Sequence, residues 1–235
     1  MVESGVLYVV STPIGNLRDI TLRALDVLGQ VDLIAAEDTR RTAVLLAEYG
    51  IHTPMTSYHE YNRARKAPQL IARLQSGQSL ALVSDAGTPG ISDPGAHLVR
   101  EALANGLRVE AIPGPTALVT ALVISGLATD RFAFEGFLPA KKGRTTRLES
   151  LREETRTLVL YESPHRLLRT LRDLLRVLGD RQAVMARELT KKFQEVIRGS
   201  LSELVSTLER KKVKGEVVLI VAGKPRGERL VKASE

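Results

Sequence analysis

The chain has 235 residues, of which 43% are hydrophobic, and it carries a formal net charge of +7. This length suits one large domain or two modest ones, and no apolar run reaches the roughly 18 residues of a membrane-spanning helix. The absence of cysteine excludes disulfides and thiolate metal sites, and the four histidines are not paired at metal-ligand spacing. We therefore expect a cytoplasmic protein without a signal peptide, membrane span or metal site.

Basic residues are concentrated in the second half. Residues 1–112 hold 10 Lys and Arg against 12 Asp and Glu, whereas residues 113–235 hold 24 against 15. A one-sided basic surface indicates a polyanionic partner, most simply nucleic acid, although a solvated surface serving solubility would give the same composition. Because there is no Trp and there are only nine other aromatic rings of Tyr and Phe, we expect recognition through phosphates, 2′-hydroxyls and shape rather than base stacking.

Strands and helices alternate in the first half. Apolar, β-branched runs predict four strands, at residues 6–10, 31–36, 79–83 and 108–112. Cap and stop residues predict four helices, one ending at residue 28 and the others at 39–49, 60–75 and 96–104. Asp19 or Thr21 would cap the first helix, Thr39 the second, and residues 51–59 are expected to be loop. This alternation predicts a mostly parallel sheet with helices on both faces.

The segment Pro113-Gly-Pro115 is the expected domain boundary, because it interrupts both helix and strand. It gives an N-terminal domain of residues 1–112 and a basic C-terminal domain of residues 113–235. The second domain is predicted to be a mixed α/β unit with strands at 131–138, 157–161, 182–187, 193–199 and 216–222. Its helices are expected at 116–124, at 163–178 with Ser163 as cap, and at 201–211. A further helix is expected to follow the basic segment 141–147 and to end at about residue 154. Residues 224–235 are expected to be frayed.

The stretch at residues 79–95 is the one around which the rest is organised. A short apolar run enters a loop with Gly87, Gly90, Gly95 and two prolines, and a helix follows. Glycine lets backbone approach a ligand closely, and proline holds a loop's shape. Together with the loops at 11–19 and 37–41, this loop would line a ligand site at the carboxyl ends of parallel strands. The alternative is an ordinary strand-to-helix connection.

Five motifs occur in a characteristic order. They are Thr12-Pro-Ile-Gly-Asn-Leu-Arg-Asp19, Ala36-Glu-Asp-Thr-Arg40, Ser84-Asp-Ala-Gly-Thr-Pro-Gly-Ile-Ser-Asp-Pro-Gly95, Pro113-Gly-Pro-Thr-Ala117 and Tyr161-Glu-Ser-Pro-His-Arg166. In this order and spacing they resemble the ribosomal RNA small subunit methyltransferase I family. The resemblance covers nearly all of residues 5–223. The resemblance implies 2′-O-methylation of a cytidine ribose in 16S rRNA, with S-adenosylmethionine as cofactor. It also implies the tetrapyrrole-methylase-like, class III fold of two α/β domains, a cofactor cleft between them, and a homodimer.

The resemblance also implies cofactor contacts at matching positions. These are Pro13, Asp85, Ala86, Gly87, Ile91, Thr116, Ala117, Glu162 and Thr190. Members of the family often carry a further small C-terminal helical segment, whereas this sequence stops soon after its last predicted strand. If that segment helps to hold rRNA, we expect a weaker grip on RNA here.

Catalysis requires a base, or a cation that stabilises the developing alkoxide, beside the ribose hydroxyl. The candidates are Asp38, Glu37, Glu162 and Lys191, and His165 ranks below the carboxylates. Expected RNA contacts are Arg40 and Arg166 to phosphate, with Lys141, Lys142, Arg144 and Arg147 as a basic cluster. The alternative role of each charged residue is an ordinary ion pair or a helix cap.

Two other functions stay open at this stage. One is a methyltransferase of the same fold that acts on a tetrapyrrole or another small ring, against which the basic second half argues. The other is a non-catalytic RNA-binding α/β protein, against which the filled motif positions argue. A monomer that relies on ribosome shape is the alternative to the homodimer.

Overall fold

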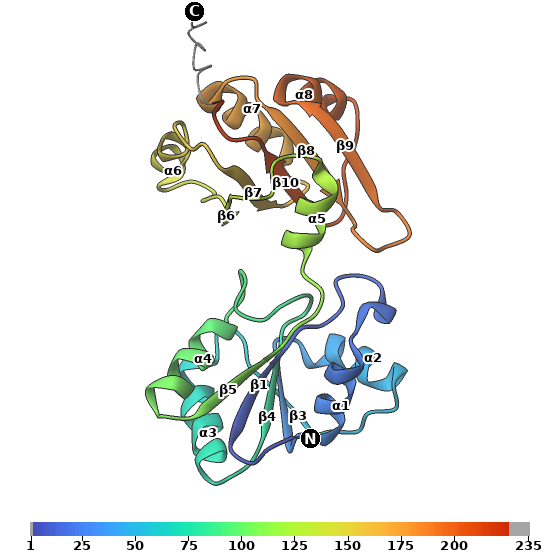
Figure 1. Ribbon diagram of the computed structural model, residues 1–235, viewed down its shortest axis with the longest axis vertical. Coiled ribbons are helices and arrows are strands. Elements are labelled where there is room, and N and C mark those ends of the chain that lie inside the picture. Colours follow the sequence, from blue (N-terminus) through green and yellow to red (C-terminus); the bar gives the residue numbers. More distant parts are fainter. Residues whose placement is uncertain (1, 226–235) are drawn as a thin grey trace, which may run out of the picture. The chain divides into compact units, whose positions relative to one another are not determined.

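The computed structural model describes residues 2–225 and divides into two compact units, one up to Ala117 and the other from Leu118. The expectation for residues 226–235 lies outside the described residues. Within the described part, no helix combines the length and apolar character needed to cross a membrane. Each unit is built on one five-stranded sheet (Figure 1).

The first unit is a parallel sheet in the order β3-β2-β4-β1-β5. Its strands are β1 Val6–Val10, β2 Leu33–Ala36, β3 Met55–Ser57, β4 Leu80–Val83 and β5 Arg108–Ile112. Its helices are the short 3-10 helix Leu17–Asp19, α1 Leu22–Gln30, α2 Thr39–Glu48, α3 Arg63–Gln75 and α4 Gly95–Ala104. All residues of β1, β2 and β4 are buried, as expected for central parallel strands covered on both faces.

Two apolar clusters cover the two faces of this sheet. Alternating residues of β1 point to opposite faces, so Val6, Tyr8 and Val10 pack with α1 and Leu7 packs with α3 and α4. Figure 1 shows α1 and α2 on one side of the sheet and α3 and α4 on the other. The parallel α/β prediction is therefore confirmed.

The second unit is a mixed sheet in the order β6-β7-β10-β8-β9. Its strands are β6 Phe132–Phe137, β7 Thr157–Glu162, β8 Gln182–Arg187, β9 Glu195–Ser200 and β10 Val217–Val221. Its helices are α5 Ala117–Ser125, which begins at the boundary, α6 Arg144–Ser150, α7 Leu167–Leu178 and α8 Leu201–Glu209. Strands β6 and β7 run parallel, and the other neighbouring pairs are antiparallel.

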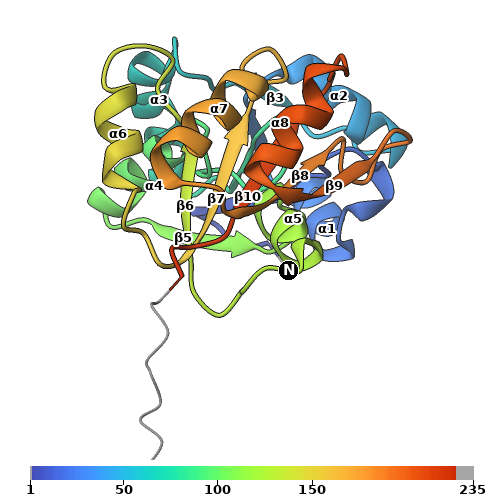
Figure 2. The same ribbon diagram turned by 90° about the horizontal axis from the view of Figure 1, so that it is seen from above.

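Helices α6, α7 and α8 bury their apolar faces in one core against this sheet. In α7 the buried residues Leu167, Leu171 and Leu174 recur at helical spacing and form one stripe. Figure 2 shows α7 and α8 side by side over the sheet. Helix α8 begins with a capping box, in which Ser200 and Glu203 each accept the other's backbone N–H, a motif that stabilises a helix by about 1 kcal/mol.

Several expected element boundaries are wrong for local reasons. Residues 55–57, expected to be loop, form β3, which pairs in parallel with β2 at the edge of the sheet. Asp38 rather than Thr39 caps α2, because its carboxylate accepts the Arg40 N–H at 2.9 Å. Helix α7 begins at Leu167 rather than at Ser163, since Ser163 starts a turn whose carbonyl accepts the N–H groups of Arg166 and Leu167.

Candidate active site

Three loops gather at the carboxyl edge of the first sheet. They follow β1, β2 and β4, which are adjacent in the order β2-β4-β1, so parallel strands bring the loop starts at residues 11, 37 and 84 to one edge. The segment at 113–116, which follows β5, leaves the same edge beside β1. This is the edge that the sequence predicts as the ligand site.

Reciprocal backbone hydrogen bonds join the first and third of these loops. The N–H of Thr12 donates to the Gly87 carbonyl at 2.9 Å, and the Gly87 N–H donates to the Thr12 carbonyl at 3.0 Å. The Thr12 hydroxyl also donates to the Ser84 carbonyl at 3.2 Å. Thr88 connects to Ser11 through their hydroxyls at 2.9 Å and donates to the Pro115 carbonyl at 3.3 Å. These contacts hold the backbone of three segments in one fixed arrangement.

Gly87 is required by this arrangement. Its φ is +84°, in the left-handed region that β-branched residues rarely adopt. A Cβ there would sit 3.5 Å from Ile14 Cγ2, in ordinary contact, so the backbone conformation rather than space selects glycine. Asp93 shapes the far end of the same loop, since its Oδ1 accepts the N–H groups of both Gly90 and Gly95 at 2.7 Å.

Three acidic residues from two loops form a connected group. The Glu37 carboxylate accepts the Asp85 N–H at 3.2 Å, and the Asp85 carboxylate accepts the Asp38 N–H at 2.9 Å. Arg41 lies 3.3 Å from the other oxygen of Asp85. Burial, reinforced by the negative charges of Asp85 and Asp93, raises the pKa of Glu37 above its usual 4.5. The Glu37 carboxylate is therefore a stronger proton acceptor than an ordinary glutamate.

Asp38 and Arg40 form a close ion pair. Arg40 Nε donates to Asp38 Oδ1 at 3.0 Å, and Arg40 Nη2 lies 2.7 Å from Oδ2. Hydrogen bonds from the Arg40 side chain and backbone hold the pKa of Asp38 well below its usual range. A carboxylate held ionised in this way is a weak proton acceptor, so the geometry favours the ion-pair and helix-cap role for Asp38.

Glu162, at the end of β7 in the second unit, is buried and saturated with hydrogen bonds. Its Oε1 accepts the Ser163 N–H at 2.8 Å and lies 3.0 Å from Arg166 Nε, and its Oε2 accepts the Thr170 hydroxyl at 2.6 Å. Only 1% of the Glu162 side chain is exposed. This environment suits a group that fixes the start of α7, and it leaves no accessible carboxylate oxygen for a substrate.

Thr190 and Lys191 lie in the turn after β8. Both Glu188 and Thr190 have positive φ, +50° and +64°, and the Thr190 hydroxyl is buried without a hydrogen-bond partner among the described residues. Lys191 Nζ lies 3.0 Å from Glu188 and 3.1 Å from Glu216. Although burial alone would lower the pKa of Lys191, these hydrogen bonds raise it above its usual 10.5, so the side chain remains a cation.

The expected basic cluster separates into two kinds of residue. Lys141 and Lys142 are exposed, and Arg147 pairs with Glu135. Arg144, in contrast, is only 4% exposed. Its guanidinium donates to Asp173 at 2.9 Å, to the Thr170 hydroxyl at 2.8 Å and to the Pro139 carbonyl at 3.1 Å. The expectation that Arg144 contacts RNA is therefore corrected: it joins α6 to α7.

Arg166 is also engaged within its own unit, through Glu162 and the Leu138 carbonyl. Arg40 has a highly exposed side chain although it pairs with Asp38. The remaining cofactor candidates of the first unit lie on or beside the joined loops, and they are Pro13, Ala86, Ile91, Thr116 and Ala117. Ile91 is 38% exposed, so its side chain is accessible to a ligand.

The sequence did not indicate a cavity of about 430 Å³ beside the acidic group. Glu37, Asp38 and Arg40 line it together with Ser57, His59 and Tyr61. The last three follow or belong to β3, which was expected to be loop, and this is why they were missed. Within residues 2–225, no group of three or more His, Cys, Asp and Glu could hold a metal ion.

Comparison with known proteins gives one consistent result. The profile of the tetrapyrrole (corrin/porphyrin) methylases matches residues 6–205. The chain is 52% identical over 229 residues to ribosomal RNA small subunit methyltransferase I of Haemophilus influenzae, covering 96% of this chain and 81% of that protein. It is 50% identical over 220 residues to the Thermotoga maritima protein of the same name, covering 94% and 99%.

Among solved structures, the chain is similar to uroporphyrin-III C-methyl transferase from Thermus thermophilus complexed with S-adenyl homocysteine. The TM-score is 0.66 at 19% identity, covering 92% of this chain and 96% of the other. At this identity the likeness establishes the fold alone.

Proposed function

We propose that this chain methylates 16S rRNA of the small ribosomal subunit. The proposal rests on family membership: the chain belongs to the ribosomal RNA small subunit methyltransferase I family, within the tetrapyrrole methylases. Family membership confirms the resemblance drawn from the five motifs. The proposed reaction is S-adenosylmethionine-dependent transfer of a methyl group to the 2′-oxygen of a cytidine ribose. The observation that carries the proposal is the joined loop edge of the first sheet, with Gly87 at its centre and Glu37 and Asp85 beside it.

The residues of this edge fit the cofactor chemically. S-adenosylmethionine supplies a methyl group on a sulfonium cation and also carries an ammonium and a carboxylate. Carboxylates such as Glu37 and Asp85 suit its cationic groups, and the Gly/Pro loops offer backbone donors and acceptors. We assign cofactor contacts to Pro13, the loop residues 85–87, Ile91 and the segment 116–117, and in the second unit to Thr190, whose buried hydroxyl has no hydrogen-bond partner among the described residues. The saturated Glu162 carboxylate instead fixes the start of α7.

Methyl transfer is an in-line displacement. The ribose 2′-oxygen forms the new C–O bond while the C–S bond breaks, sulfur keeps that electron pair, and the hydroxyl proton passes to a base. We assign the base to Glu37, because burial raises its pKa and it lies on the cavity beside the joined loops. Asp38 keeps the helix start and Arg40 in place, and Lys191 is a cation suited to phosphate or a developing alkoxide.

The proposal also covers the oligomeric state and the cellular location. We infer a homodimer, since closed two-fold symmetry is the commonest arrangement among soluble homo-oligomers. We infer a cytoplasmic location, since the proposed substrate is a ribosomal subunit. Sedimentation at micromolar concentration would measure the mass. A monomer that is fully active on 30S subunits would contradict the dimer.

A transfer assay tests the function directly. Radiolabelled S-adenosylmethionine is incubated with the protein and either 30S subunits, free 16S rRNA or a uroporphyrinogen-type ring. We expect label in 16S rRNA, recovered as 2′-O-methylcytidine after nuclease digestion. Label in the ring alone would replace the RNA substrate with a small molecule, and cofactor binding without transfer to any of the three would contradict the proposed reaction.

A further inference from the structure

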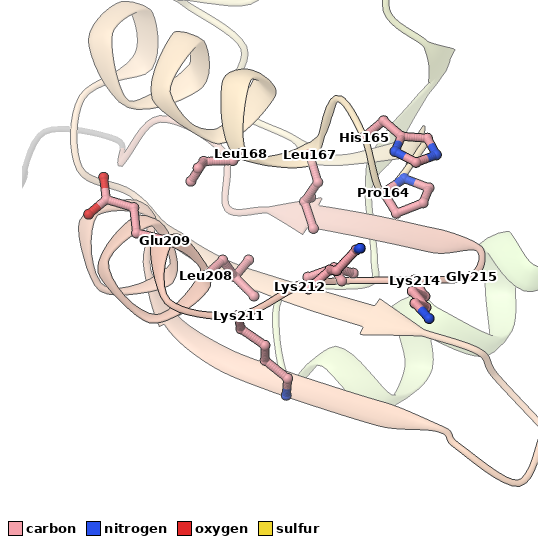
Figure 3. Close-up of a pocket in the computed structure, with 11 residues that line it drawn as sticks. Pro164, His165, Leu167, Leu168, Leu208, Glu209, Lys211, Lys212, Lys214 and Gly215 are labelled. Carbon is pink, nitrogen blue, oxygen red and sulfur yellow. The ribbon is translucent and has the colours of Figure 1, made fainter.

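A second cavity, of about 630 Å³, lies within the second unit. It is formed by the start of α7, the end of α8 and the loop that leads to β10. Leucines of α7 and α8, the residues just before α7 and the lysines of the loop at 211–214 line it (Figure 3). This volume is within the usual range for small-ligand pockets, about 300–1,000 Å³.

The lysines of this pocket differ in their partners. Lys211 pairs with Glu195 on β9, and Figure 3 shows its side chain pointing away from the leucines. Glu209, the one acidic residue of the lining, is neutralised by Arg172 at 2.7 Å. Lys212 and Lys214 are exposed, and in the described part of the chain neither ammonium has an ion-pair partner. The loop that borders the pocket therefore carries two positive charges without ion-pair partners in the described part of the chain, and Figure 3 shows the Lys212 side chain pointing toward Leu167.

The interior of the pocket is apolar. Leu167 and Leu168 of α7 lie across from Leu208 of α8, and Pro164 and His165 close one end (Figure 3). His165 is exposed, so its ring offers a flat face. An apolar wall with a ring at one end and two free ammonium groups at the rim matches a ligand that has a flat base and an attached phosphate.

The lysine loop is held firmly at its far end. Gly215 has a φ of +86°, and a Cβ there would overlap the Glu188 carboxylate. The same Glu188 oxygen accepts the Glu216 N–H at 3.0 Å. The next residue, Val217, is in register with Glu162 of β7, which places the loop beside the start of α7. The loop therefore enters β10 at a fixed point.

We propose that this pocket binds one unpaired nucleotide of the RNA substrate. The base packs against Leu168 and Leu208, and the flanking phosphates bind Lys212 and Lys214. The inference rests on the proposed RNA methylation and adds to it a site for a nucleotide other than the one methylated, in a unit remote in sequence from the cofactor loops.

Binding of a fluorescent single-stranded cytidine decamer, measured across a range of salt concentrations, tests the pocket. The variant K212A/K214A should bind about tenfold more weakly at low salt, and the slope of log affinity against log salt should be shallower by about 1.4, since each lost contact to a single strand removes about 0.7. The matched control R23A/R65A removes two exposed charges from the first unit and should leave both quantities at wild-type values.

A second variant separates base packing from charge. L168S should lower affinity several-fold with the salt slope unchanged, because it removes apolar contact and no charge. Melting temperature and S-adenosylmethionine affinity, measured for every variant, should equal the wild-type values. Equal losses in K212A/K214A and R23A/R65A would overturn the pocket, as would a decaglutamate peptide that binds it as tightly as the RNA does. Wild-type protein that binds the decamer through these lysines yet methylates no rRNA would refute the proposed function and leave the pocket standing.

Discussion

The two sheet edges that carry the candidate residues are held together by different kinds of contact. At the edge of the first sheet, main-chain groups dominate: Thr12 and Gly87 exchange two backbone hydrogen bonds, and Asp93 and Asp85 bind backbone N–H groups. At the edge of the second sheet where β7 and β8 end, side-chain ion pairs dominate, as in the contacts of Lys191 and Glu162. The first edge is therefore a fixed backbone framework. The charges of the second edge neutralise one another, since Lys191 lies between Glu188 and Glu216 and Glu162 pairs with Arg166.

The largest effect should come from breaking the first edge at Gly87. In Gly87→Val a β-branched residue must adopt a φ of +84°, which costs about 1–3 kcal/mol and displaces the loop. We expect cofactor affinity to fall more than tenfold and methyl transfer to be lost, as measured by calorimetric titration and the transfer assay. Gly106→Val is the control, because Gly106 also has positive φ, +70°, and lies at the end of α4. Similar losses of cofactor affinity in both variants would remove Gly87 from the site.

A pH profile of Glu37→Gln is the next largest test. If Glu37 is the base, its removal should lower kcat by about 10²–10⁴-fold and abolish the rise of activity with pH. Asp38→Asn should have a much smaller effect, since its carboxylate is occupied by Arg40. A profile of Glu37→Gln that parallels the wild type would exclude it as base.

The pH dependence of stability tests the raised pKa of Glu37 independently of activity. Its pKa is raised in the folded protein, so protonation favours folding: this stabilisation is full below the unfolded pKa of about 4.5 and is lost as pH rises through the higher folded value. Glu37→Gln should therefore be more stable than the wild type in urea at pH 7.5 and match it near pH 4. A variant that is less stable at pH 7.5 would show that the carboxylate is held by favourable contacts instead.

A third test distinguishes Arg144 from its exposed neighbours. Arg144→Ala removes a buried guanidinium with three acceptors, and we expect the second unit to lose about 2–4 kcal/mol of unfolding free energy. Asp173 keeps a contact with Arg176, which limits the loss. Urea unfolding followed by circular dichroism measures it. A change in unfolding free energy below about 0.5 kcal/mol would show that Arg144 behaves as a surface cation.

The smallest expected effect belongs to the two exposed lysines. In K141A/K142A the unfolding free energy should stay within about 0.5 kcal/mol of wild type. The salt slope for single-stranded RNA should become shallower by about 1.4 if both lysines touch phosphates. An unaltered slope would make them a solvated surface and leave RNA binding to other parts of the second unit.

The sequence predicted the elements that have strong local signals. Buried runs such as those of β1 and β4, and the amphipathic stripe of α7, identify themselves by their periodicity. Strand β3 has only three residues, Met55–Ser57, all partly buried, and its existence depends on pairing with β2. Such a strand has no local pattern to find. For the same reason, the cavity that it lines with Glu37 could not be foreseen.

The roles of charged residues were harder to predict than their presence. The run at residues 141–147 reads as a uniform basic surface, yet Arg144 and Leu148, four residues apart in α6, share the buried face. That helical spacing was a usable signal. The raised pKa of Glu37 was not predictable, because it arises from burial and from Asp85 and Asp93, which are 48 and 56 residues away. The partners of Glu162 are near in sequence, at one, four and eight residues, but its burial comes from the packing of the second unit.

The strand order of the second unit has a consequence for synthesis on the ribosome. Its last strand, β10, lies in the middle of the sheet, between β7 and β8. Until Val217–Val221 has left the exit tunnel, the nascent chain holds β6–β7 and β8–β9 as two separate ribbons whose inner edges are unpaired. The second unit therefore completes its core only after β10 has emerged, whereas the first unit can close its sheet as soon as β5 emerges.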